Sequence, residues 1–188
     1  MKQALLVIDV QKIYTNDASA YYVENQAAVV SNINKLIEKY KKDSLIVYIA
    51  HKNKADGSDS GRMYDYAGDD GEVEFIEGTE AVDYDSNLLI VDGIHLVKHK
   101  YDSFVGTGLY DLLKSKGVEK VIIVGFMTNF CCESTARTAH DLDFYVDFVR
   151  DATGTPGTEE CTPEVLIETT CSSINGGFGL VVDTNDLL

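Results

Sequence analysis

Short apolar runs alternate along this chain with longer segments in which apolar residues recur at helical spacing. Buried strands are predicted at 3–9, 45–50, 88–91, 96–99, 118–124, 144–149 and 180–182. Helices are predicted at 22–41, 107–116, 131–139 and 163–172. Alternating elements of this kind predict an α/β fold with three layers (α/β/α), in which helices cover both faces of a doubly wound, mostly parallel six-stranded sheet.

One segment, 52–78, follows neither pattern. It is polar and rich in glycine, and a stretch of this length without regular structure is uncommon and often functional. We expect it to cap an active site or to make contacts between the subunits of a homo-oligomer. A solvated surface loop is an equally good interpretation.

A cysteine follows one of the predicted strands at the point where a helix is expected to begin. Residues 121–124 are all β-branched, Gly125 interrupts the run, and Thr128 and Asn129 are suited to cap the next helix. Free N–H groups and the helix dipole at such a point lower the pKa of a cysteine and can hold an oxyanion. We therefore interpret Cys131 as a nucleophile; the alternative is a buried cysteine that serves as a small apolar side chain.

An acid and a lysine follow two other predicted strands. Asp9 ends the apolar run 5–8, and Lys98 lies near the end of the strand predicted at 96–99. Ligands bind at the carboxyl ends of the strands in open parallel sheets, so both side chains are expected in the same crevice as Cys131. An acid that takes a proton, a cation that favours the thiolate and a nucleophile together predict amide hydrolysis through a thioester.

Three tracts of the sequence carry a family resemblance: VIDVQ at 7–11, KHKYDSFVGTGL at 98–109 and GFMTNFCCESTARTA at 125–139. In these tracts and in their order, the chain resembles the isochorismatase-like cysteine hydrolases. This family includes nicotinamidases, N-carbamoylsarcosine amidohydrolases and ureidoacrylate amidohydrolases. The third tract is highly specific, whereas the first would carry little weight alone.

The resemblance implies a catalytic triad of Asp9, Lys98 and Cys131. Lys98 is preferred to Lys100 because the family's lysine stands three residues before the aromatic that Tyr101 matches. Cys131 is preferred to its neighbour because the family's nucleophile follows the Thr-x-x spacing found before it. Substrate-binding candidates are Gln11, Tyr14, Phe104 and Phe130, each of which could instead belong to the core.

The resemblance also implies a particular backbone around the nucleophile. Family members carry a cis peptide bond before this loop, which here would join Phe126 to Met127. The backbone N–H groups of Met127 and Cys131 would then form the oxyanion hole. Family tracts often continue Asp-Leu-Gly-Tyr, whereas Asp143 stands here in place of the glycine. Aspartate tolerates a left-handed conformation better than most residues, so we expect the turn to be preserved.

Metal binding separates branches of this family. Nicotinamidases carry an Asp-x-His and a further His that bind a metal, whereas the corresponding region here, IAHKNKADGSD, contains His51 alone. A divalent metal site needs roughly three ligands, so we expect no metal and no cofactor. Isochorismatases cleave a vinyl ether and lack the thiol. Cysteine-dependent hydrolysis of a C–N bond in a small amide or carbamoyl compound is therefore favoured over an isochorismatase-type or other non-amide hydrolase.

The composition bounds the protein class. One domain, 1–188, is predicted, long enough for a substantial core, with 45% hydrophobic residues. The formal net charge of −15 disfavours nucleic acid and strongly anionic substrates. No apolar run approaches the roughly 20 residues of a membrane span, and the first strand leaves no room for a signal peptide. The four cysteines show no zinc-type pair, so a reduced cytoplasmic protein with a small-molecule substrate is expected.

Two other classes of protein share part of this pattern. A receiver-type phosphoacceptor domain also has an aspartate after its first strand and a later lysine, but it needs a pair of acids where this chain has only Asp9. A non-catalytic scaffold of the same fold would have no physical reason to keep Asp9, Lys98 and Cys131, because a buried charge cluster destabilises a fold. The receiver domain and the non-catalytic scaffold are therefore both disfavoured.

Overall fold

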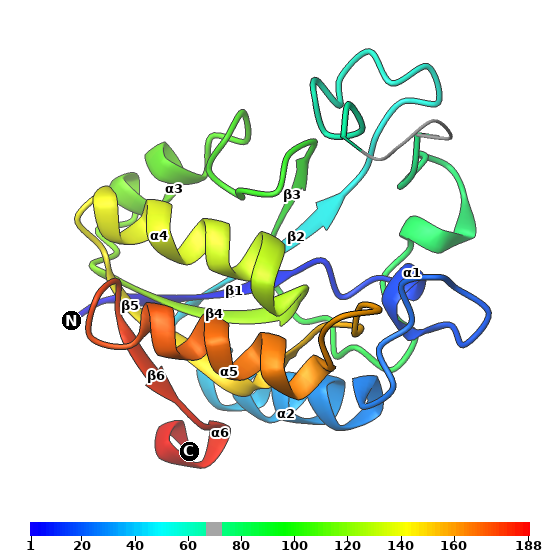
Figure 1. The fold of residues 1–188 in the computed structure, drawn as a ribbon. Helices are drawn as coiled ribbons and strands as arrows, with labels where there is room; N and C mark the ends of the chain where they lie inside the picture. Colours follow the sequence, from blue (N-terminus) through cyan, green and yellow to red (C-terminus); the bar gives the residue numbers. More distant parts are fainter. Residues whose placement is uncertain (67–72) are drawn as a thin grey trace.

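A single sheet of parallel strands forms the centre of the molecule. The structure is a computed structural model that describes residues 1–66 and 73–188. Its strands are β1 (Gln3–Ile8), β2 (Leu45–His51), β3 (Ile94–Lys98), β4 (Lys120–Phe126), β5 (Tyr145–Gly154) and β6 (Leu180–Val182). They form a 6-stranded sheet in the order β3-β2-β1-β4-β5-β6, and every neighbouring pair is parallel (Figure 1). The predicted doubly wound α/β fold is confirmed.

Helices follow most of the strands. The α-helices are α1 (Lys12–Thr15), α2 (Gln26–Tyr40), α3 (Leu109–Ser115), α4 (Glu133–Asp141), α5 (Pro163–Ile174) and α6 (Thr184–Leu187). A 3-10 turn, η1 (Glu80–Val82), and a π-helical turn, η2 (Thr128–Cys132), complete the regular structure. None of the helices in the described ranges has the length and apolar character needed to cross a bilayer.

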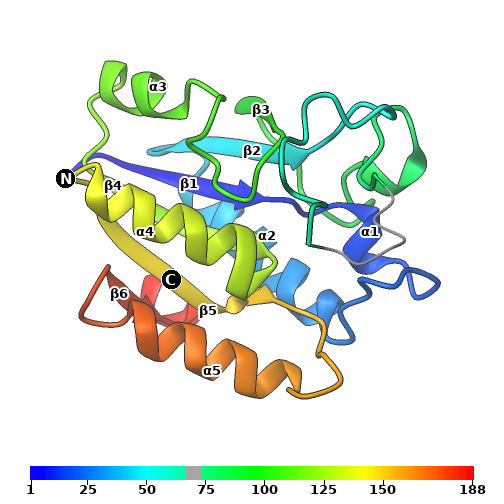
Figure 2. The same cartoon turned by 45° about the horizontal axis from the view of Figure 1, so that its top comes forward.

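Alternate residues of β1 divide between the two faces of the sheet. Leu5 and Val7 belong to the cluster that includes the buried side of α2. Leu6 and Ile8 belong to the cluster that includes apolar residues of α3, α4 and α5. In Figure 2, α4 and α5 lie in front of the sheet and α2 lies behind it. The central strands are therefore covered on both faces, as their continuous apolar sequences predict.

The prediction of a strand at 88–91 is wrong. This apolar segment lies in a loop, and its backbone is bound by side chains instead of a neighbouring strand. Leu89 N–H donates to Asn34 Oδ1 at 2.8 Å, and Val91 N–H donates to Tyr48 Oη at 3.0 Å. Tyr48 Oη in turn donates to the carbonyl of Leu89 at 3.0 Å. Leu88, Leu89 and Val91 pack in the core cluster that includes Tyr48, and their burial produces a strand-like sequence pattern although no strand pairs with this segment.

The start of the cysteine helix also differs from the prediction. Cys131 lies in the π-helical turn η2, and α4 begins only at Glu133. Neither Thr128 nor Asn129 caps the helix, since no side-chain cap hydrogen bond is present at η2 or α4. Asn129 Oδ1 instead accepts a hydrogen bond from Thr155 Oγ1 at 2.7 Å. At the other end of α4, Asp143 has a φ of 64°, the left-handed conformation expected for it.

A close contact between β1 and β4 makes Gly125 the most constrained glycine near the predicted site. Its φ is 124°, and a Cβ built on it would lie 1.9 Å from the carbonyl oxygen of Ile8. Gly125→Ala is therefore expected to lower the free energy of unfolding by about 3 kcal/mol or more, because strain and overlap with a backbone atom add. Urea denaturation measures this change.

Gly117→Ala is the matched control for that substitution. Gly117 also has a positive φ, 67°, but a Cβ there would meet nothing within 4 Å. Its cost should be limited to conformational strain, about 1 kcal/mol. Equal losses of stability in the two variants would show that the contact between β1 and β4 is looser than the structure indicates.

Candidate active site

The carboxyl ends of three strands bring Asp9, Lys98 and Cys131 together. Asp9 follows β1 directly with a φ of 51°, Lys98 is the last residue of β3, and Cys131 lies in η2 after β4. Lys98 Nζ is 2.8 Å from Asp9 Oδ2 and 3.2 Å from Cys131 Sγ. All three side chains are buried, with exposures of 0%, 0% and 1%. The structure therefore places these three side chains together at the carboxyl edge of the sheet.

Lys98 is fixed by three partners. Besides Asp9 and Cys131, its Nζ donates to the carbonyl oxygen of Lys100 at 2.9 Å. An ammonium group has three N–H donors, so each can be matched to one of these partners. Burial opposes the charge of Lys98, but Asp9 and Cys131 raise its pKa on balance. Lys98 is accordingly a charged and immobile group beside both the carboxylate and the thiol.

Burial shifts the pKa of Cys131 in the opposite direction from the one expected at a helix start. The pKa of its thiol is raised to about 12, chiefly because the side chain is removed from water, and Lys98 offsets only part of this effect. Burial also raises the pKa of Asp9, against the lowering effect of Lys98. The resting group is therefore a thiol, and it needs a base to become a nucleophile.

The neighbouring cysteine occupies a different environment. Cys132 is completely buried among apolar residues that pack under α4, and its pKa is raised well above the ordinary value by burial. Only Cys131 lines the cavity described below. Side chains at successive helical positions diverge by about 100°, so the two thiols cannot face the same space.

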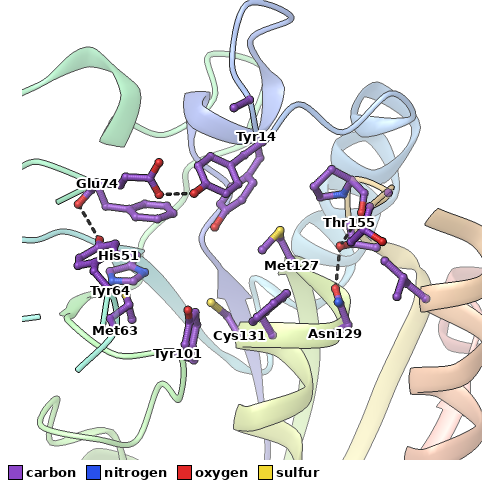
Figure 3. Close-up of a pocket in the computed structure, with 18 residues that line it drawn as sticks. Tyr14, His51, Met63, Tyr64, Glu74, Tyr101, Met127, Asn129, Cys131 and Thr155 are labelled. Carbon is purple, nitrogen blue, oxygen red and sulfur yellow. Dashed lines mark hydrogen bonds between the residues drawn. The ribbon is translucent and has the colours of Figure 1, made fainter. Parts of the chain in front are cut away.

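The backbone before Cys131 turns sharply out of the sheet. The peptide bond between Phe126 and Met127 is cis. The Met127 carbonyl accepts hydrogen bonds from Phe130 N–H at 3.3 Å and Cys132 N–H at 3.1 Å. Within the described part of the chain, the N–H of Met127 donates no hydrogen bond. Met127 also lines the cavity beside Cys131, so this N–H is a candidate oxyanion donor (Figure 3).

A cavity of about 650 Å³ opens beside Cys131. Its walls come from several separate parts of the chain, and Figure 3 shows these side chains around a common space. The lining residues are Tyr14, Ala20, Tyr21, His51, Met63, Tyr64, Glu74, Phe75, Tyr101, Met127, Asn129, Phe130, Cys131, Thr155, Pro156, Gly157, Thr158 and Leu166. A volume of this size is typical of a site for a small molecule.

Two of the four predicted pocket residues, Tyr14 and Phe130, line this cavity. Gln11 does not: its amide accepts from His51 N–H at 2.9 Å and donates to the carbonyls of His51 at 3.0 Å and Val82 at 2.7 Å. Gln11 is thus a buried link between β2 and η1. Phe104 does not line the cavity either, because it stacks on Phe144 beneath α3 and α4, with ring centroids 6.1 Å apart.

The segment 52–78 supplies part of the cavity wall. Met63, Tyr64, Glu74 and Phe75 all line it, as do residues 155–158 after β5. In the sequence, the segment 52–78 stood out only because it is long and lacks a regular pattern of apolar residues. No local signal marked the individual side chains, because they reach the site through the tertiary fold. Residues 67–72 of this segment lie outside the described part of the chain.

His51 lies at the end of β2 with its ring buried against the cavity. It stacks on Phe75 with ring centroids 4.4 Å apart and an interplanar angle of 8°. Among the described residues, neither ring nitrogen has a hydrogen-bond partner. Burial lowers its pKa to about 2, with Lys98 acting in the same direction. His51 is therefore a neutral imidazole, available to a ligand as donor or acceptor.

The same cluster contains three groups of the kinds that bind metals. Ligand atoms of Asp9, His51 and Cys131 lie within 4.8 Å of one another. They could hold one ion only if Lys98 moved or lost its charge. Its ammonium is 2.8 Å from Asp9 Oδ2 and 3.2 Å from Cys131 Sγ, and it would repel a second cation.

Comparisons with known proteins agree with this fold. The family model described as the isochorismatase domain matches residues 3–174. Nicotinamidase 3 of Arabidopsis thaliana is 29% identical over 184 residues, covering 98% of this chain and 86% of that protein. The ureidoacrylate amidohydrolase RutB of Agrobacterium fabrum is 30% identical over 89 residues, 47% of this chain and 37% of the relative.

The fold of a solved structure is also similar to that of this chain. The crystal structure of a cysteine hydrolase from Pseudomonas syringae pv. phaseolicola is similar with a TM-score of 0.89 and 26% identity. The match covers 99% of this chain and 90% of that one. The fold and the cluster define an α/β protein of the hydrolase type. More particularly, the chain belongs to the isochorismatase family.

Proposed function

We propose that this protein hydrolyses the C–N bond of a small amide or carbamoyl compound through a thioester on Cys131. The observation that carries the proposal is the buried contact of Lys98 with both Asp9 and Cys131, at 2.8 and 3.2 Å. Cys131 also lines a cavity large enough for such a substrate. A base, a fixed cation and a nucleophile at one cavity are the parts that acyl transfer needs.

In the first step, Asp9 takes the proton of the Cys131 thiol as Sγ attacks the carbonyl carbon. A C–S bond forms, and the carbonyl electron pair moves to oxygen. The N–H groups of Met127 and Cys131 hold this oxyanion. Asp9 then gives the proton to the nitrogen, the C–N bond breaks, and ammonia or an amine leaves. The raised pKa of the thiol explains why a carboxylate base is required.

In the second step, water replaces the amine. Asp9 removes a proton from the water as its oxygen attacks the thioester carbonyl, and the same oxyanion donors act again. The C–S bond breaks, Cys131 recovers a proton from Asp9, and the acid product leaves. Lys98 keeps Asp9 ionised between the two steps, because its ammonium lies 2.8 Å from the carboxylate.

A screen for ammonia release tests the proposal. Small amides, ureas and carbamoyl compounds are incubated with the protein, and ammonia is measured directly. Turnover of at least one compound is expected, and acid quenching during turnover should trap an acyl group on the peptide that contains Cys131. Turnover without this adduct, or with the acyl group on another residue, would contradict the thioester mechanism.

Hydrolysis is expected to fail in acid and to persist in mild alkali. Asp9 must be ionised to act, and burial holds its pKa above the ordinary value of 3.8. The rate constant kcat/KM should therefore rise with pH along an acid limb whose midpoint lies above 3.8. No alkaline loss is expected up to about pH 10, because the pKa of Lys98 is raised from 10.5.

A His51→Gln variant is the control for that pH profile. The pKa of His51 is about 2, so His51 does not change charge over the range in which the limb is measured. The midpoint of the acid limb should accordingly stay in place in the variant. A midpoint near the ordinary pKa of histidine that disappears with His51 would assign the limb to the imidazole and remove Asp9 as the base.

Two expectations about the setting of the protein remain predictions: a cytoplasmic location and a homo-oligomeric assembly. Sedimentation or gel filtration at several protein concentrations measures the second. Neither is required by the mechanism above, since Asp9, Lys98 and Cys131 all belong to one chain.

A further inference from the structure

Part of the cavity beside Cys131 has an aromatic wall, since six of its 18 lining residues are Tyr or Phe. Tyr101 and Phe130 pack together at its edge, with ring centroids 5.3 Å apart. Tyr14, Tyr21 and Phe75 form a second group, in which the centroids are 6.0 to 6.4 Å apart. The negative faces of such rings attract organic cations, and the attraction is strongest where water is excluded.

Glu74 places a carboxylate in this aromatic wall. It is the one Asp or Glu among the described residues that line the cavity. The hydroxyl of Tyr21 donates to Glu74 Oε2, and the Glu74 carbonyl accepts from Tyr64 Oη at 3.0 Å and from Asn53 Nδ2 at 3.1 Å. These bonds fix the backbone and one carboxylate oxygen. In Figure 3, Glu74 lies on the same side of the cavity as His51 and Tyr64, across from Asn129.

No basic side chain neutralises this carboxylate in the described ranges. Glu74 forms no ion pair there, and neither lysine nor arginine lines the cavity. The adjoining residues 67–72 have the sequence AGDDGE, which contains three acids and no base. The charge of Glu74 is therefore left for a ligand to balance.

The cations around the cavity are engaged elsewhere. Lys12 lines a neighbouring hollow together with Glu74, but it is paired with Glu80 at 2.6 Å. Lys98 is paired with Asp9 beneath the cavity at 2.8 Å. Lys100 and Arg62 line a separate hollow, which shares Met63 and Tyr101 with the cavity. There Lys100 donates to a backbone carbonyl at 2.8 Å, and Arg62 forms an ion pair at 3.0 Å. The formal net charge of −15 adds a repulsive field for anions.

We infer that the substrate is an amide whose other end carries an ammonium or guanidinium group, bound by Glu74 within the aromatic wall. This inference rests on the proposed function, because it names the substrate class of the same cavity. Ureidoacrylate, the compound in the name of one relative, bears a carboxylate instead. Among the described residues, the cavity lining offers no cation for such a group.

Three amides of matched length test the inference. δ-Aminovaleramide, hexanamide and adipamate present an ammonium, a methyl and a carboxylate at the same distance from the amide carbon. We expect kcat/KM for the ammonium compound to exceed that for hexanamide by at least about tenfold, and adipamate to be the poorest substrate. The preference should shrink at high salt, because screening weakens the attraction.

Substitutions of Glu74 test whether this residue causes the preference for the ammonium compound. In Glu74→Gln, which keeps an acceptor for the Tyr21 hydroxyl, the ratio of the ammonium compound to hexanamide should fall to about one. Glu74→Lys should reverse the ranking in favour of adipamate. Glu38→Gln is the matched control: Glu38 is an exposed carboxylate paired with Lys41 at 2.6 Å, outside the cavity lining, and the wild-type ratio should persist.

Binding without turnover separates this inference from the proposed function. Each amide should protect Cys131 from alkylation by iodoacetamide at alkaline pH, in the same ranking as for kcat/KM. If hexanamide is hydrolysed but the ammonium compound has no advantage in turnover or protection, the inference is wrong and the hydrolase proposal stands. If the ammonium compound protects best but no amide is hydrolysed, the inference about the cavity holds and the hydrolase proposal fails.

Discussion

Cys131→Ala is expected to abolish amide hydrolysis, whereas Cys132→Ala is expected to retain most of it. The Sγ atom of Cys131 lies 3.2 Å from Lys98 Nζ and faces the cavity. Without that thiol no thioester can form, and loss of a nucleophile of this kind lowers kcat by roughly 10⁴-fold or more. Ammonia release under saturating substrate measures the difference between the two variants.

Cys132 supplies the matched control because it is the same residue type one position along the chain. Its side chain packs in the core, so Cys132→Ala removes a small buried group and costs about 1 kcal/mol in stability. Circular dichroism checks that both variants remain folded. Loss of activity in Cys132→Ala with activity kept in Cys131→Ala would shift the nucleophile by one residue and overturn the assignment.

The sheet could be predicted because its strands are buried on both faces. The residues of β1 from Ala4 to Ile8 are all fully buried, and those of β4 from Val121 to Phe126 are as well. Such strands appear in a sequence as continuous apolar runs. The same rule failed at 88–91, where the apolar residues are partly buried beside Tyr48 and bonded through side chains. An apolar sequence indicates that a segment is buried, but it does not indicate which groups form hydrogen bonds with its backbone.

The cluster could be predicted for a topological reason. Asp9, Lys98 and Cys131 each lie at or just after the carboxyl end of a strand, and parallel strands place those ends at one edge. The family resemblance then selected Lys98 and Cys131 from neighbouring candidates. The pocket was harder to predict because no local pattern links the parts of its wall, which are residues 14, 20–21, 51, 63–64, 74–75, 101, 127, 129–131, 155–158 and 166.

The electrostatics of the thiol required the structure. A cysteine at a strand-to-helix junction suggests a lowered pKa, but that expectation assumes access to water and a regular helix start. Cys131 has neither, since it is 1% exposed and lies in a π-helical turn. Desolvation then outweighs the attraction of Lys98 and raises its pKa to about 12. The proposal that the thiol needs a base such as Asp9 therefore rests on burial, which the sequence does not report.

Lys98→Met is expected to destabilise the protein by about 3–5 kcal/mol and to abolish hydrolysis. Lys98 and Asp9 form an ion pair with both side chains fully buried, so removal of the lysine leaves a carboxylate with no counter-charge. Lys12→Met is the control: its partner Glu80 is 79% exposed, and an exposed pair of this kind contributes little to stability because water screens it. Urea denaturation at neutral pH measures both losses.

The double variant Asp9→Asn/Lys98→Met separates stability from catalysis. With both charges removed, most of the lost stability should return, because a neutral pair avoids the cost of burying one charge alone. Hydrolysis should stay absent, since the base is gone. In Lys98→Met alone, burial holds the pKa of Asp9 further above its unfolded value, so the folded state binds the extra proton. The loss in the free energy of unfolding of Lys98→Met relative to wild type should therefore shrink as the pH falls toward about 3.9, the pKa of aspartate in the unfolded chain. A deficit independent of pH, or a double variant no more stable than Lys98→Met, would show that packing and not charge makes Lys98 necessary.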